Sequence, residues 1–129
     1  MDKALLETGQ KIRREVLGAE HVDRATSNLN AFNRRFQEFM TEYCWGGVWG
    51  QQALDRKQRS LNNLCILSAL NRPEEFKAHT RGALNNGCTV DEIFETLIQV
   101  TVYVGVPAGV NAFKLASEVF EAQGIEVPE

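Results

Sequence analysis

Helical spacing of apolar residues dominates almost the whole chain, and it constrains the fold more than any other feature of the sequence. Residues that cap or break helices divide this pattern into segments. Asp2 can cap a first helix that ends at Gly18, and "TVDE" at residues 89–92 forms a capping box before a later one. We expect about six helices, which cover residues 2–17, 23–44, 55–70, 73–87, 89–104 and 108–123. The sequence therefore predicts an all-α protein.

Two segments required a choice between structures. The β-branched residues at 100–104 are typical of a strand, but Ile93, Leu97, Val100 and Val104 keep helical spacing, and we predict a helix. The stretch "WGGVWG" at residues 45–50 combines three glycines with two tryptophans, and we predict a tight, aromatic-rich connection there. The predicted helix of residues 23–44 carries an apolar side formed by Leu29, Phe32, Phe36, Phe39 and Met40.

The length and charge of the chain exclude several classes of protein. A length of 129 residues fits one domain, spanning residues 1–129, with enough chain for a core. The formal net charge of −3, without a long block of one sign, argues against a nucleic-acid binder, which needs a basic face. No stretch approaches the roughly 20 apolar residues of a membrane span, and the first residues lack a signal-peptide pattern. We expect a cytoplasmic protein with no nucleic-acid or membrane partner.

The cysteines and histidines do not form a recognisable metal-binding or disulfide pattern. Cys44, Cys65 and Cys88 are odd in number and widely spaced, and His21 and His79 lie far apart in the sequence. These spacings argue against a disulfide scaffold and a structural zinc site. We predict no metal site and interpret each cysteine as a small buried hydrophobe.

His79 lies on the apolar stripe of the helix predicted at residues 73–87, together with Phe76, Ala83 and Leu84. One interpretation is a core histidine that is hydrogen-bonded to a neighbour. The other is a general acid or base, because imidazole exchanges protons near neutral pH without special tuning. The second interpretation is favoured because other helices also carry polar residues at positions where a hydrophobic core would have apolar ones.

Arg59 and Asn63 are two such residues, four positions apart on the helix predicted at 55–70. They continue a stripe formed by Ile66, Leu67 and Leu70, which predicts a pocket floor with an anion-binding mouth. The alternative for Arg59 is a solvated position in the first turn.

Two further polar residues are candidates on other helices. Glu42 precedes the glycine-rich stretch, where a carboxylate among apolar neighbours is suited to hold a proton for transfer. Its alternative is a surface charge at a helix end. Gln99 offers an uncharged hydrogen-bond donor on the helix of residues 89–104.

Motifs that would indicate a cofactor are absent. The chain has no P-loop, no GxGxxG, no GxSxG elbow, no HExxH and no cluster of metal ligands. If the protein is an enzyme, we therefore predict acid–base chemistry on a small molecule without a cofactor.

Taken together, "TEYCWGGVW", "LDRKQRSL", "HTRGALNNG" and "YVGVPA" resemble the γ-carboxymuconolactone decarboxylases, over nearly the whole chain from about residue 9 to residue 120. The resemblance implies an all-α, alkylhydroperoxidase-like subunit in a homo-oligomeric ring, a hexamer or a trimer. It also implies decarboxylation of γ-carboxymuconolactone to β-ketoadipate enol-lactone in protocatechuate catabolism, the β-ketoadipate pathway of aromatic degradation. The lactone ring would serve as the electron sink, so that no cofactor is required.

The implied reaction gives each candidate residue a task. Arg59 would hold the carboxymethyl group, and His79 or Gln99 would face the lactone oxygen where charge develops. His79, or Glu42 as second choice, would deliver a proton to the α carbon. The sequence leaves open which of the two tasks His79 performs. The apolar pocket around the departing carboxylate would be lined by Trp45, Trp49 and Phe76.

Two other functions compete with this one. Alkylhydroperoxidase-type relatives reduce peroxides with a CxxC pair followed by a histidine at the position of His79. In this chain Arg72 and Glu75 occupy the two cysteine positions, which argues against peroxide reduction. The third possibility is a helical oligomer that serves as a binding module. In that case His79, Arg59 and Glu42 would not converge in space.

Overall fold

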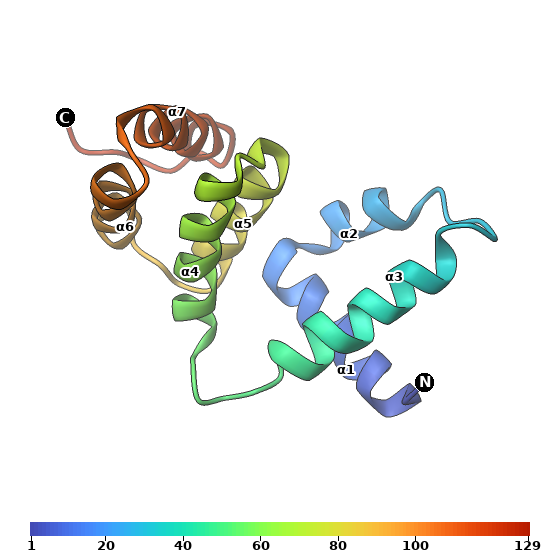
Figure 1. Cartoon of the computed structure of the whole chain (residues 1–129). Helices are drawn as coiled ribbons and strands as arrows, with labels where there is room; N and C mark the ends of the chain where they lie inside the picture. Colours follow the sequence, from blue (N-terminus) through green and yellow to red (C-terminus); the bar gives the residue numbers. More distant parts are fainter. The chain divides into compact units, whose positions relative to one another are not determined.

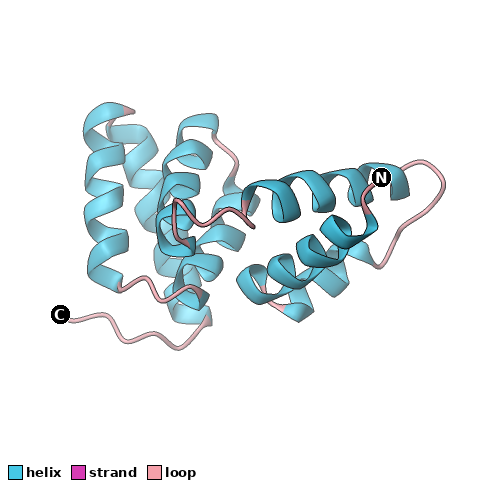
Figure 2. Cartoon of the chain, turned by 90° about the horizontal axis from the view of Figure 1, so that it is seen from below, coloured by secondary structure: helices cyan, strands magenta, loops and turns pink.

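A computed structural model describes all residues 1–129 and contains helices and no strands (Figures 1 and 2). The predicted all-α class is therefore confirmed. The chain divides into two compact units, residues 1–55 and residues 56–129, and each is described by itself. None of the helices has the length and apolar character needed to cross a membrane.

The first unit contains three α-helices and one π-helix: α1 (Lys3–Leu17), α2 (Ala19–Thr26), α3 (Arg34–Met40) and η1 (Thr41–Val48). The predicted cap of the first helix is confirmed, because the Asp2 side chain accepts a hydrogen bond of 3.1 Å from the N–H of Leu5. The helix ends at Gly18, whose φ of 92° favours glycine.

The single helix predicted over residues 23–44 is wrong, because a loop separates α2 from α3. The Asn30 side chain accepts hydrogen bonds from the N–H groups of Phe32 (2.8 Å) and Asn33 (3.2 Å). The Asn33 side chain in turn accepts one of 2.8 Å from the N–H of Asn30. Such local side-chain bonds compete with the backbone bonds of a helix. Phe32, which we placed on the apolar side of this helix, is 95% exposed.

The tight connection predicted at "WGGVWG" is also wrong, because most of this stretch belongs to η1, which continues directly from α3. The N–H of Trp49 donates to the carbonyl oxygen of Cys44, five residues back, at 3.0 Å. Helix α1 packs against η1. A Cβ atom on Gly9 would overlap the Thr41 carbonyl, and one on Gly46 would overlap the Leu5 carbonyl. Glycine at 46 thus serves close helix packing rather than a turn.

The second unit contains α4 (Arg56–Leu70), α5 (Pro73–Asn85), α6 (Val90–Tyr103) and α7 (Val106–Ala122). The capping box before α6 is confirmed, since Thr89 and Glu92 bond each other's backbone N–H groups. The choice of helix over strand at residues 100–104 is confirmed through Tyr103, where α6 ends. The whole chain thus has seven α-helices and a π-helix, where we expected about six helices.

The core of the second unit lies among α4, α5, α6 and α7 and buries large side chains from each. Its buried members include Leu64, Phe76, Ala83, Ile93, Leu97, Val100, Ala112, Ala116 and Phe120. The predicted apolar stripe of α4 is partly wrong, because Ile66 and Leu70 are 51% and 59% exposed. Helix α4 instead turns Ser60 and Leu64 inward, one turn apart on the neighbouring face.

Candidate active site

Helices α4 and α5 form a hairpin that brings Asn63 and His79 together. The turn between the helices contains Asn71, which adopts a φ of 56°, and Pro73 begins α5. Asn63 Nδ2 lies 3.4 Å from His79 Nδ1, and both side chains are half-buried. The second ring nitrogen of His79, Nε2, does not take part in this contact. A neutral imidazole whose Nδ1 accepts a hydrogen bond carries its proton on Nε2.

Arg59 lies one helical turn before Asn63 on α4 and is half-buried rather than solvated. Its Nε atom is buried and has no hydrogen-bond acceptor. A buried N–H group without an acceptor is costly, and a guanidinium presents its donors in a fork that matches a carboxylate. The arrangement is chemically suited to hold an anionic group.

Gln99 is exposed on α6 and lines an open groove of about 440 Å³ between α4 and α6. Asn62, Cys65 and Thr96 line the same groove. Gln99 therefore has access to a small molecule, while its closeness to His79 stays a prediction.

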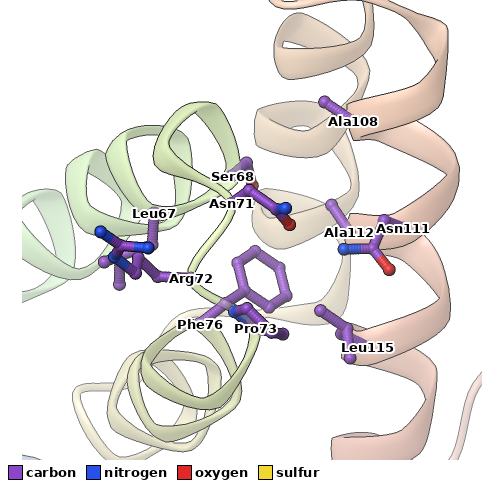
Figure 3. Close-up of a pocket in the computed structure, with 10 residues that line it drawn as sticks. All are labelled: Leu67, Ser68, Asn71, Arg72, Pro73, Phe76, Ala108, Asn111, Ala112 and Leu115. Carbon is purple, nitrogen blue, oxygen red and sulfur yellow. The ribbon is translucent and has the colours of Figure 1, made fainter.

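Phe76 is 1% exposed and belongs to the core of the second unit. Figure 3 shows its ring directed into the space between α4, α5 and α7, beside Asn71 and Leu115. The cavity at this place measures about 10 Å³, which corresponds to about one water molecule. Phe76 supports the fold around His79, and its role as a pocket wall stays a prediction.

Glu42, Trp45 and Trp49 lie in the first unit, so their closeness to His79 also stays a prediction. Glu42 is half-buried on η1, and its Oε1 accepts a hydrogen bond of 3.0 Å from the backbone N–H of Asp2. The two indole rings are buried and stacked, with ring centroids 4.8 Å apart. They come from positions four apart, which meet on one face of a helix.

Sequence reasoning did not single out Arg13, which is buried on α1. The signal was present in the helical pattern, because residue 13 lies four positions after Gly9 and four before Leu17, both of which are buried. A charged residue on a buried stripe requires a partner or a ligand. Lys11 and Arg14 beside it are exposed, so the local charge pattern is typical of a solvated face.

Comparison with known proteins assigns the chain to a family. The model of the carboxymuconolactone decarboxylase family matches residues 34–118. The chain belongs to this family. It is 42% identical over 124 residues to a 4-carboxymuconolactone decarboxylase of Acinetobacter baylyi, covering 96% of this chain and 92% of the relative. It is 43% identical over 112 residues to a nitrosuccinic acid decarboxylase of Metarhizium robertsii, covering 87% of this chain and 78% of the relative.

Membership in the carboxymuconolactone decarboxylase family makes this chain an enzyme of the carboxy-lyase class. The family resemblance seen in the sequence is thus confirmed. The three cysteines are free thiols. Burial raises the pKa of the Cys44 thiol, an effect that the nearby Arg13 opposes, and burial also raises the pKa of the Cys65 thiol. Both thiols are therefore protonated at neutral pH and poor nucleophiles. No group of three His, Cys, Asp or Glu side chains is placed to hold a metal ion.

Proposed function

We propose that the chain decarboxylates γ-carboxymuconolactone to β-ketoadipate enol-lactone without a cofactor, as a step of protocatechuate catabolism in the cytoplasm. The observation that carries this proposal is the Asn63–His79 contact one helical turn from the buried Arg59 Nε. Arg59 and His79 belong to the motifs "LDRKQRSL" and "HTRGALNNG", which resemble the family. The similarity to a relative named 4-carboxymuconolactone decarboxylase supports the choice of substrate.

The substrate carries its own electron sink. The γ carbon of the lactone ring bears the leaving carboxylate, a carboxymethyl group and the ring oxygen. When the bond to the leaving carboxylate breaks, CO2 departs and the electron pair forms a double bond between the γ and β carbons. The former α–β π pair moves toward the lactone carbonyl and gives a dienolate. A proton added at the α carbon then yields the enol-lactone.

Arg59 binds the carboxymethyl group in this mechanism. Its buried Nε provides a donor that has no acceptor in the chain, and the guanidinium fork can hold a carboxylate through two hydrogen bonds. Asn63, one turn along α4, orients the imidazole next to this group. The remote carboxylate is thereby fixed while the other one leaves.

His79 delivers the α proton from Nε2, because Asn63 occupies Nδ1. Gln99 donates to the lactone oxygen, where negative charge develops. Glu42 is the second candidate for the acid. The alternative role of His79, as the donor to the lactone oxygen, gives a different result in D2O. Loss of an acid at position 79 removes stereospecific deuteration of the α carbon, whereas loss of an oxyanion donor slows turnover and preserves stereospecificity.

The surroundings of the site complete the proposal. Trp45, Trp49 and Phe76 exclude water from the departing carboxylate. The chain forms a single functional domain and assembles into a homo-oligomeric ring, a hexamer or a trimer. Large apolar side chains that are exposed in the single chain support assembly, because an interface between copies would cover them. Phe32 is 95% exposed and Tyr103 is 83% exposed. Sedimentation equilibrium measures the mass of the assembly directly.

The decisive experiment follows the loss of the ultraviolet absorbance of γ-carboxymuconolactone with purified protein and no added cofactor. His79→Gln should lower kcat about 10²- to 10⁴-fold, the contribution expected of a proton-transfer residue. His21→Gln is the matched control, because it changes the other histidine, which lies on α2. A His79→Gln protein that keeps the wild-type kcat in an intact oligomer removes His79 from the mechanism.

A second candidate substrate is nitrosuccinic acid, because a relative that is 43% identical is named for its decarboxylation. The chemistry is analogous. The reacting carbon of nitrosuccinate also carries a carboxymethyl group, and the nitro group accepts the electron pair when CO2 leaves. The same arginine and acid could serve both substrates. Parallel measurement of kcat/KM for the two acids decides between them, and the lactone should be preferred.

A further inference from the structure

Arg13 on α1 is a buried cation, with 7% of its surface exposed. Its Nη1 donates hydrogen bonds to Gln37 Oε1 (3.1 Å) and to Thr41 Oγ1 (3.3 Å). Its Nε is buried and has no acceptor. The two neutral contacts fix the guanidinium in place without neutralising it.

The first unit provides Arg13 with no carboxylate partner. The titratable group that interacts with it is the Cys44 thiol. Burial raises the pKa of this thiol, and Arg13 only partly opposes the effect, so Cys44 is uncharged at neutral pH. Burial also lowers the pKa of Arg13, but a guanidinium remains protonated under physiological conditions. A charge buried without a counter-ion is strongly unfavourable, which indicates that an anion from outside the first unit completes the site.

Arg13 lines an open pocket of about 490 Å³ formed by residues of the first unit. Gln10, Gln37 and Thr41 give it uncharged hydrogen-bonding groups. Its charged lining residues are Arg13, Arg14, Arg34 and Glu38. Arg14 is paired with Asp23, which lies outside the pocket, at 2.7 Å. The lining keeps an excess of positive charge, and its volume is in the range of small-molecule sites.

We propose that this pocket binds a small organic acid, whose carboxylate lies against the Arg13 guanidinium. The uncharged groups of Gln10, Gln37 and Thr41 contact the remainder of the ligand. Bidentate binding of a carboxylate uses Nε together with an Nη atom, and Nε is the donor that the chain leaves without an acceptor. This site goes beyond the decarboxylation proposed above, and its test does not depend on that activity.

The test is calorimetric titration of the full chain with succinate, at an ionic strength matched with sodium chloride. We expect the wild type to bind succinate, and Arg13→Met to weaken this binding about 30-fold or more, because one partner of a buried charge pair is lost. Arg59→Met should keep the succinate binding that depends on Arg13, because Arg59 belongs to the second unit and does not line this pocket; any succinate held by the proposed substrate site is lost in this variant alone. Arg35→Met is the matched surface control, because Arg35 is exposed on α3 and does not line the pocket.

A second variant keeps the test valid if Arg13→Met does not fold. Gln10 is exposed at the pocket, so Gln10→Glu adds a negative charge without disturbing the core, and it should also weaken succinate binding. The proposal is overturned by an absence of succinate binding to the wild type, by equal binding to the wild type and the pocket variants, or by complete loss of binding in both Arg13→Met and Arg59→Met. A change of oligomer mass in Arg13→Met without any succinate effect also overturns it, because the anion is then a side chain of a second copy.

Discussion

Replacement of Asn63 by leucine tests how much of the activity depends on the orientation of His79. The substitution keeps the approximate size of the side chain and removes the N–H group that lies 3.4 Å from His79 Nδ1. A neutral hydrogen bond contributes about 0.5–1.5 kcal/mol. If the full value is lost in the transition state, kcat falls about 2- to 13-fold, since about 1.4 kcal/mol corresponds to a factor of ten. KM should change little, because in the proposed mechanism Asn63 acts through the imidazole that it contacts.

The assay is the ultraviolet measurement of lactone consumption at saturating substrate, with thermal unfolding to verify the fold. Asn111→Leu is the control, because Asn111 is an exposed amide on α7. Two results refute the reasoning. A kcat unchanged within error means that the contact does not position His79. A loss of 100-fold or more, equal to that of His79→Gln, means that Asn63 touches the reacting atoms itself.

Three further predictions concern binding and stability. Arg59→Lys should raise KM roughly tenfold and leave kcat nearly unchanged, because an ammonium cannot reproduce a bidentate fork; an unchanged KM would mean that Arg59 does not hold the substrate. Phe76→Ala should lower the free energy of unfolding in urea by about 3–5 kcal/mol, whereas Phe32→Ala, on an exposed side chain, should have little effect. The pKa of Glu92 is lowered from 4.5, and the largest cause is the hydrogen bond that its carboxylate accepts from the backbone N–H of Thr89. The charged form of Glu92 therefore stabilises the fold above pH 4.5. This contribution is lost as the pH falls through the lowered pKa. The difference in Tm between wild type and Glu92→Gln should therefore be present at pH 7 and disappear in acid.

Local signals predicted the parts of the fold that depend on neighbouring residues. The Asp2 cap and the Thr89–Glu92 box act over three residues, and both form as expected. Helix α6 was also predictable, since Ile93, Leu97 and Val100 are buried at helical spacing. In each case the deciding interaction lies within a single helix.

The wrong predictions arise from contacts between distant segments, or from local hydrogen bonds that compete with a helix. The helix predicted over residues 23–44 is broken where Asn30 and Asn33 bond the backbone, and the apolar pattern gave no sign of this competition. The glycines of "WGGVWG" were interpreted as turn residues. The structure uses Gly46 to let α1 approach η1, a contact with a distant segment that the local pattern does not contain.

The candidate site contains features that the sequence predicts and features that it does not. Arg59 and Asn63 were predictable as neighbours, because positions four apart share a helix face. The burial of Arg59 Nε depends on packing and was not predictable, although it strengthens the interpretation of Arg59 as an anion-binding residue. Glu42 and His79 belong to different units of the chain, and neither periodicity nor spacing predicts the distance between them.

The Asn63–His79 contact follows from the register of the α4–α5 hairpin. Residues 63 and 79 lie eight positions before and after Asn71, the residue of the turn with a φ of 56°. A contact at the other end of the hairpin is also symmetric about Asn71. Asn86 donates to the carbonyl oxygen of Arg56 at 3.3 Å, and these residues lie fifteen positions either side of Asn71. Two antiparallel helices joined by a short turn bring positions equidistant from it to the same level. A histidine and an asparagine at equal distances from an Asn-x-Pro turn are thus a sequence signal for this pairing, which apolar periodicity alone does not reveal.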